Sequence, residues 1–100
     1  MPRVSVPADA TNKNVQTLLG ASAPITGWVT GQILSDPDNT EPVTLKIGSS
    51  TMTATNYDNE LAPGESAPLS QNGLPMFLPS LYVRNDGAAA VDVVFNIKNT

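Results

Sequence analysis

The sequence predicts an all-β fold, an antiparallel β-sandwich that is jelly-roll-like, and two observations support this prediction. Apolar and polar residues alternate with a period of two in several short segments, which is typical of strands covered on one side. Gly, Pro and Asn separate these segments at regular spacing, as they do in sandwiches and barrels. No segment predicts a helix longer than one turn.

The composition is that of a single small domain with few charges. One hundred residues can bury one modest core. Charged residues make up 14% of the chain, against roughly 25% in typical domains. The five basic residues are scattered, which excludes a surface that neutralises several phosphates of a nucleic acid. No apolar run approaches the ~20 residues of a membrane span, and the first residues lack the apolar stretch of a secretory signal. We therefore expect a soluble chain without a nucleic acid or membrane partner.

The end of the chain carries the clearest strand pattern. In residues 91–98, alternate positions are apolar, and this face is predicted to point into the core. Residues 81–84 are β-branched, aromatic or long, and an Asn85-Asp86-Gly87 step follows them. Because Asp-Gly supplies the positive φ of a tight reversal, we expect residues 81–84 and 91–98 to pair as a hairpin. The inward side chains of the last strand are predicted to be Val91, Val93, Phe95 and Ile97.

Two further strand regions precede this end. Residues 25–34 alternate, and their glycines indicate a bulge, a bend or a close approach of backbones. Trp28 falls on the polar face of this strand. We expect it to cap the core, because tryptophans are highly buried on average, and an interface position is the alternative. Residues 43–47 and 51–55 are predicted to form a second hairpin.

The chain between residues 56 and 79 is predicted to contain turns and short strands. Pro63-Gly64 indicates a type II turn, since proline and glycine occupy its two central positions. A short strand is expected at residues 66–70, followed by a reversal at Asn72-Gly73.

Residues 1–24 are predicted to form an extended N-terminal arm, and residues 25–100 the sandwich domain. Three prolines interrupt the first segment and remove donors from any strand ladder. One short strand or, alternatively, one turn of helix is expected at residues 14–19. A terminus with no role is the other interpretation of the arm. If the arm lies on a neighbouring subunit, the residues expected to contact that partner are Arg3, Val4, Val6, Leu18 and Leu19.

The residue types argue against catalysis. The chain has no histidine and no cysteine, which excludes Ser-His and Cys-His nucleophile pairs, disulfides and thiolate ligands. Paired carboxylates remain at Glu60 and Glu65, but so few aromatic residues offer little to build a sugar cleft. The 36–41 loop, with Asp36, Asp38 and Glu41, is only a weak candidate for calcium. We expect no enzyme, no cofactor and no metal.

Several segments together resemble a known class of proteins. Residues 61–66 read Leu-Ala-Pro-Gly-Glu-Ser, residues 78–87 read Leu-Pro-Ser-Leu-Tyr-Val-Arg-Asn-Asp-Gly, and an alternating strand follows. This pattern, over roughly residues 43–98, resembles small β-sandwich virion proteins of tailed bacteriophages. Within that class the chain is most similar to capsid decoration, or cement, proteins.

The resemblance implies a structural protein on the capsid exterior of a virion, made in the host cytoplasm. It implies that the major capsid protein is the partner and that the chain forms a homo-oligomer, a trimer or a dimer. Many individually weak contacts would then accumulate avidity. The alternative function is a receptor- or glycan-binding module of a phage fibre or head spike.

Overall fold

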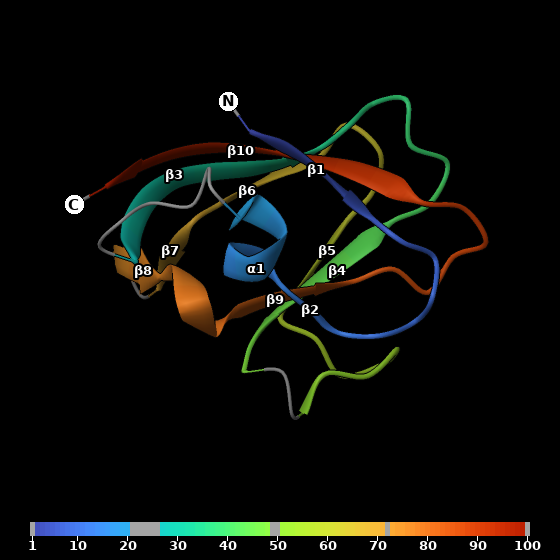
Figure 1. Cartoon of the computed structure of the whole chain (residues 1–100), viewed down its shortest axis with the longest axis horizontal. Coiled ribbons are helices and arrows are strands. Elements are labelled where there is room, and N and C mark those ends of the chain that lie inside the picture. The colour runs from blue at the N-terminus through green and yellow to red at the C-terminus, as the bar shows by residue number, and fades with distance from the viewer. Residues whose placement is uncertain (1, 21–26, 49–50, 72, 100) are drawn as a thin grey trace.

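Two antiparallel β-sheets face each other in the computed structural model, which describes residues 2–20, 27–48, 51–71 and 73–99 (Figure 1). This confirms the predicted antiparallel β-sandwich. The first sheet contains β1 (Arg3–Val6), β3 (Trp28–Ser35), β6 (Ser66–Pro68), β7 (Ser70–Gln71), β8 (Leu74–Phe77) and β10 (Val91–Asn99). The second sheet contains β2 (Lys13–Asn14), β4 (Val43–Ile47), β5 (Asn59–Leu61) and β9 (Leu81–Arg84). The helical elements are α1 (Val15–Leu19) and the 3-10 helix η3 (Leu78–Ser80).

The order of strands within each sheet brings the two ends of the chain together. The first sheet has the order β1-β10-β3-β8-β7, with β6 also pairing to β3, and the second has the order β2-β9-β4-β5. The first strand therefore lies beside the last, and the second beside the last but one. The strands β4 and β5, in the middle of the sequence, pair with each other. Strands from the first half of the chain thus pair with strands from the second half in both sheets.

The core lies between the sheets and is built from the faces that the period of two predicts. In β10, the side chains of Val91, Val93 and Phe95 are fully buried, while Ile97 near the end of the strand is only partly buried. In β3, Val29 and Ile33 point inward, as predicted. Alternation thus identified the inward face of both long strands, because every second side chain of a strand points to the same side.

The predicted hairpin of residues 81–84 and 91–98 is wrong. β9 pairs with β2 and β4 in the second sheet, whereas β10 pairs with β1 and β3 in the first. The chain between them, residues 85–90, crosses from one sheet to the other. Asn85 is fully buried in this crossover, and its Oδ1 atom accepts a hydrogen bond from the Gly87 backbone N at 2.9 Å. The local turn exists, but it redirects the chain to the opposite sheet.

The predicted hairpin of residues 43–47 and 51–55 is wrong as well. β4 pairs with β5, further along the chain, and with β9. Met52 is buried, but Ala54 is exposed and neither residue belongs to a strand. The Pro63-Gly64 turn is confirmed, since Gly64 has a φ of 86° and the Glu65 backbone N donates to the Ala62 carbonyl at 2.9 Å. The short strand at 66–70 is confirmed by β6 and β7.

The predicted extended arm is wrong for residues 3–20, whereas residues 1 and 21–24 lie outside the described part of the chain. β1 is the edge strand of the first sheet and pairs with β10, and β2 is an edge strand of the second. The alternative of a helical turn is right, since α1 forms at residues 15–19 with Asn14 as its N-cap. Residues 3–20 therefore belong to the sandwich. Their apolar side chains are removed from water by packing against its core, which stabilises this arrangement.

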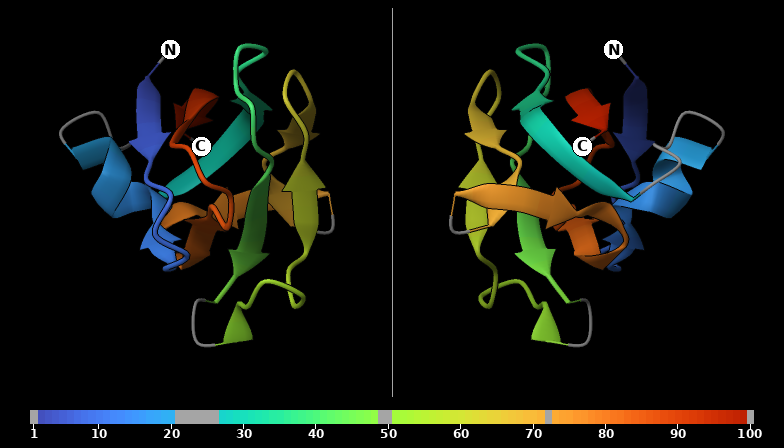
Figure 2. Two further views of the ribbon diagram at one scale, coloured as in Figure 1. Left: turned by 90° about the vertical axis from the view of Figure 1, so that its right-hand side faces the viewer. Right: turned by 90° about the vertical axis from the view of Figure 1, so that its left-hand side faces the viewer.

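The helix α1 closes one side of the sandwich. It contacts β1, β2, β9 and η3, and its Val15 and Leu19 side chains are buried in the shared core. Figure 2 shows α1 on the side opposite β5 and β6. On that second side the edge strands β5 and β6 are not hydrogen-bonded to each other. The two sides of the sandwich are therefore closed differently.

Candidate functional site

The residues predicted to bind a partner are largely used inside the molecule. Val6 and Leu19 are buried in the core, and Val4 and Leu18 are partly buried against it. Arg3 is exposed, but its guanidinium pairs with the carboxylates of Asp36 and Asp92, the latter at 3.3 Å between Nη1 and Oδ2. These side chains hold β1 in the first sheet. The partner-binding surface predicted at the N-terminus is therefore wrong for Val6 and Leu19.

The 36–41 loop uses its polar groups to hold itself in place. The Asp36 carboxylate is almost buried and accepts a hydrogen bond from the Asp38 backbone N at 2.8 Å, as well as the ion pair from Arg3. The backbone hydrogen bond, and then Arg3, lower the pKa of Asp36 below its usual range. Asn39 donates to the Asp92 carbonyl at 2.8 Å and accepts from the Asp92 backbone N at 2.9 Å.

No reactive cluster emerges among the described residues. The Glu65 carboxylate accepts a hydrogen bond from the Ala62 backbone N at 2.7 Å, so it stabilises the turn after β5. Throughout the described part of the chain, no three acidic, His or Cys side chains gather as a group that could hold a metal ion. Nor does any described helix have the length and apolarity needed to cross a bilayer.

The molecule has an acidic end where four loops meet, shown at the right in Figure 1. The loops are residues 7–12, 36–42, 62–65 and 85–90. A backbone hydrogen bond from Ala10 N to Asn85 O at 3.2 Å joins the first loop to the last, and Gly64 N donates to the carbonyl of Ser35, at the end of β3, at 2.9 Å. Six of the nine acidic residues of the chain belong to these loops: Asp9, Asp36, Asp38, Glu41, Glu65 and Asp86. The Arg84 guanidinium pairs with the Asp86 carboxylate at 2.9 Å between Nε and Oδ1.

An exposed aromatic pair lies at the opposite end, where β3 begins and β8 ends. The Trp28 and Phe77 rings are 5.0 Å apart between centroids and tilted by 47°. Their side chains stay 48% and 38% exposed, so the expectation that Trp28 caps the core is wrong and the interface alternative gains support. Trp28 is exposed because neighbouring side chains of a strand point to opposite faces, and Val29 points into the core.

Neutral polar residues continue this outer face along β3 and β10. Thr30 lies opposite Lys98, and Gln32 opposite Asn96, in the antiparallel register. No carboxylate of the described residues pairs with Lys98, whereas every other lysine and arginine has an acidic partner. The surface formed by Trp28, Phe77, Thr30, Gln32, Asn96 and Lys98 is called the aromatic face below.

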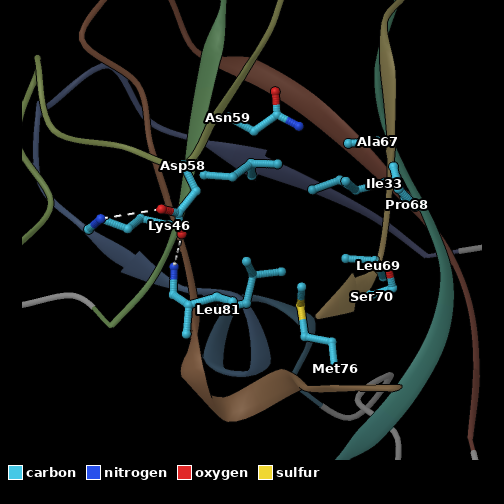
Figure 3. A pocket seen from close by; sticks show the side chains of 12 residues that line it. Ile33, Lys46, Asp58, Asn59, Ala67, Pro68, Leu69, Ser70, Met76 and Leu81 are labelled. Carbon is cyan, nitrogen blue, oxygen red and sulfur yellow. Dashed lines mark hydrogen bonds and ion pairs between the residues drawn. The ribbon is translucent and has the colours of Figure 1, made fainter. Parts of the chain in front are cut away.

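A cavity of about 240 Å³ opens between the two sheets on the side of β5 and β6 (Figure 3). Apolar side chains from both sheets form its walls: Ile33, Ala67, Leu69 and Met76 from the first, and Leu45, Ile47 and Leu81 from the second. Lys46, Asp58, Asn59 and Ser70 line it as well and are the polar members of the lining. It is a second candidate binding site.

The sequence held a signal for one of these sites and not for the other. Trp28 alternates with buried residues and shares its parity with Thr30 and Gln32, which is the signal of an outward position. The cavity joins segments that are far apart in the chain, so local patterns could not reveal it.

Family models, curated proteins and solved structures yield no match to this chain.

Proposed function

We propose that the chain is a structural virion protein, a decoration or cement protein that binds and stabilises the outer surface of a bacteriophage head. The observation that carries the proposal is the exposed Trp28–Phe77 pair, whose neighbours on the same face are neutral polar residues and Lys98. Exposed aromatic side chains are enriched at protein interfaces, where they contribute large buried area. The proposed partner is the major capsid protein, and the proposed location is the capsid exterior.

The winding of the chain supports a finer assignment of the fold. The first strand pairs with the last, the second with β9, and β3 with β6, while β4 and β5 form the inner hairpin. We propose that the sandwich is a jelly roll, an arrangement of two interleaved sheets that recurs in viral capsid domains. Fold alone does not specify a function, so the surface carries the rest.

The distribution of charge supports one orientation on the capsid. The acidic loop end would repel a negatively charged shell, whereas the aromatic face carries Lys98 without a described carboxylate partner. The aromatic face would therefore meet the coat and the acidic loops would point outward. A homo-oligomer, a trimer or a dimer, would repeat this contact and accumulate avidity.

The test mixes purified protein with expanded capsids that lack it, followed by sedimentation and counting of bound copies. Saturable binding at a fixed ratio to the coat protein is expected, together with strong weakening by Trp28→Ala. Tyr57→Ala is the matched control, because Tyr57 is an exposed aromatic residue in the loop between β4 and β5, outside the aromatic face. If the unmodified protein does not bind, the cement function is wrong. If Trp28→Ala binds as well as Tyr57→Ala, attachment uses another surface.

Glycan binding is the second candidate function, and the composition of the aromatic face favours it. An aromatic ring can stack against a sugar, and the nearby hydroxyl of Thr30 and the amides of Gln32 and Asn96 can hydrogen-bond its hydroxyl groups. On a glycan array this function predicts uniform binding to one sugar family, with loss in Trp28→Ala and none in Tyr57→Ala. Absence of binding to every glycan would exclude it.

A further inference from the structure

The open side of the sandwich is built differently from the closed side. At the closed side, α1 inserts Val15 and Leu19 between the edge strands β1 and β2. At the open side, no described helix lies between β5 and β6, and the inter-sheet cavity is found there. Core residues such as Ile33 and Leu69 thus line a space that reaches the surface. These residues are almost completely buried, so an apolar occupant would be stabilised by leaving water and by van der Waals contacts with the walls.

The walls of the cavity select for an aliphatic occupant. Ile33, Leu69 and Met76 face Leu45, Ile47 and Leu81 across the gap, and no aromatic residue lines it. Figure 3 shows Met76 and Leu69 on one side and Leu81 on the other, with their side chains directed into the space. Methionine adapts its shape to irregular neighbours, which suits a flexible hydrocarbon chain.

The polar residues around the cavity select for an uncharged occupant. Lys46 Nζ lies 3.3 Å from Asp58 Oδ1, and the other oxygen of Asp58 accepts a hydrogen bond from the Ile47 backbone N at 3.0 Å. The two charges neutralise each other, so neither an anion nor a cation finds an unpaired partner in them. The amide of Asn59 and the hydroxyl of Ser70 remain as neutral hydrogen-bonding groups in the lining.

We propose that the inter-sheet cavity is a binding site for a small, uncharged aliphatic molecule with a hydrogen-bonding head such as a hydroxyl or an amide. The volume of about 240 Å³ is sufficient, since an engineered apolar cavity of about 150 Å³ in another protein binds benzene. The site is separate from the aromatic face and does not depend on attachment to a capsid. Because only the folded chain has the cavity, the ligand stabilises the fold by mass action.

The experiment uses hexan-1-ol as the probe and follows the methyl resonances of the whole protein by NMR. Saturable shifts are expected at Ile33, Leu45, Ile47, Leu69 and Leu81, and the melting temperature should rise with the same concentration dependence. Shifts that never saturate, or that spread evenly over all methyl groups, would overturn the proposal. Hexanoate and hexylammonium have the same chain with a charged head and should bind more weakly. Equal binding would overturn the uncharged class.

Filling the cavity provides the matched test. Ala67→Leu adds a side chain to the cavity wall and should abolish the saturable shifts. Ala8→Leu makes the same change on an exposed loop and should leave them unchanged. If Ala67→Leu does not fold, Ser70→Leu fills the site from another position of the lining. Undiminished binding by a folded filling variant would show that hexan-1-ol binds elsewhere. A shift pattern centred on Trp28 and Phe77 would lead to the same conclusion.

Discussion

The side-chain amide of Asn85 donates a hydrogen bond to the backbone carbonyl of Val6 at 3.2 Å, although the two residues are 79 positions apart. The same nitrogen donates to the Ala89 carbonyl at 2.7 Å, and the side-chain oxygen accepts from the Gly87 backbone N. Asn85 is fully buried. One amide thus fixes the crossover between β9 and β10 and attaches it to the first strand of the sheet that it enters.

Replacing this amide should destabilise the whole fold. Asn85→Ala removes a donor from two carbonyl groups and an acceptor from one backbone N–H in a buried place. We expect the free energy of unfolding to fall by about 1–3 kcal/mol for the groups left unsatisfied. Urea denaturation measures the change. Asn96→Ala, at an exposed position of β10, is the control and should stay within about 0.5 kcal/mol. Equal effects of the two substitutions would contradict the role given to Asn85.

The N-terminal segment should prove necessary for folding. Deleting residues 1–20 removes β1, β2 and α1, and with them three buried side chains, so we expect the cooperative unfolding transition to disappear. Val6→Ala should lower the free energy of unfolding by about 2–3 kcal/mol, since two buried methyl groups are lost and a cavity remains. Val4→Ala, at a partly buried position, should have a smaller effect. A deletion variant that still unfolds cooperatively would restore the interpretation of an arm.

Local sequence patterns predicted the faces of the strands but not their partners. The alternation in β10 correctly placed Phe95 in the core, because side-chain direction depends on each residue's own backbone. Pairing depends on the rest of the chain. The Asn85-Asp86-Gly87 step looked like a hairpin turn, yet the buried amide of Asn85 sends the chain to the other sheet. The prolines of the first segment predicted an extended arm, yet the four residues of β1 pair with β10 at the other end of the chain.

The candidate sites could be predicted only where one strand carries the information. The parity of Trp28 indicates an outward position, whereas the general tendency of tryptophan to be buried predicts the opposite. Its partner Phe77 comes from β8, and no local signal joins the two residues. The inter-sheet cavity combines residues from seven strands, so it depends on packing that a single strand pattern does not contain.

Gly31 should tolerate no side chain. It has a φ of +131°, and a Cβ atom there would lie 2.0 Å from the Asn96 carbonyl oxygen on β10. Gly48 has a φ of +84°, but no heavy atom among the described residues lies within 4 Å of the place of a Cβ. Gly48→Ala should therefore cost only the backbone strain, about 1–2 kcal/mol. Gly31→Ala adds a clash with backbone, and we expect more than about 3 kcal/mol or loss of the fold. Thermal unfolding compares the two, and a similar cost would show that β3 and β10 can move apart.

The fold should lose stability in acid through carboxylates at the loop end. The backbone N of Asp38 and the guanidinium of Arg3 lower the pKa of Asp36, and the hydroxyl of Thr11, followed by Lys13, lowers the pKa of Asp9 to about 2. A carboxyl whose pKa is lower in the folded chain stabilises it fully above the unfolded value of about 4. That contribution disappears as the pH falls through the folded value. The sensitive range is therefore between about pH 4 and pH 2.

Asp36→Asn isolates the contribution of one of these groups. The variant should be less stable than the unmodified chain at pH 7, because the amide cannot form the ion pair with Arg3 or accept as a charged group from the Asp38 backbone N. The difference between the two stabilities should shrink as the pH falls through the lowered pKa of Asp36, since protonation removes the charge that the variant lacks. Urea midpoints measured from pH 7 to pH 2 test this. Asp38→Asn is the control, because its carboxylate makes no hydrogen bond or ion pair with any described residue, and it should change little across the range. A difference between Asp36→Asn and the unmodified chain that stays constant to pH 2 would show that the charge of Asp36 does not stabilise the loop.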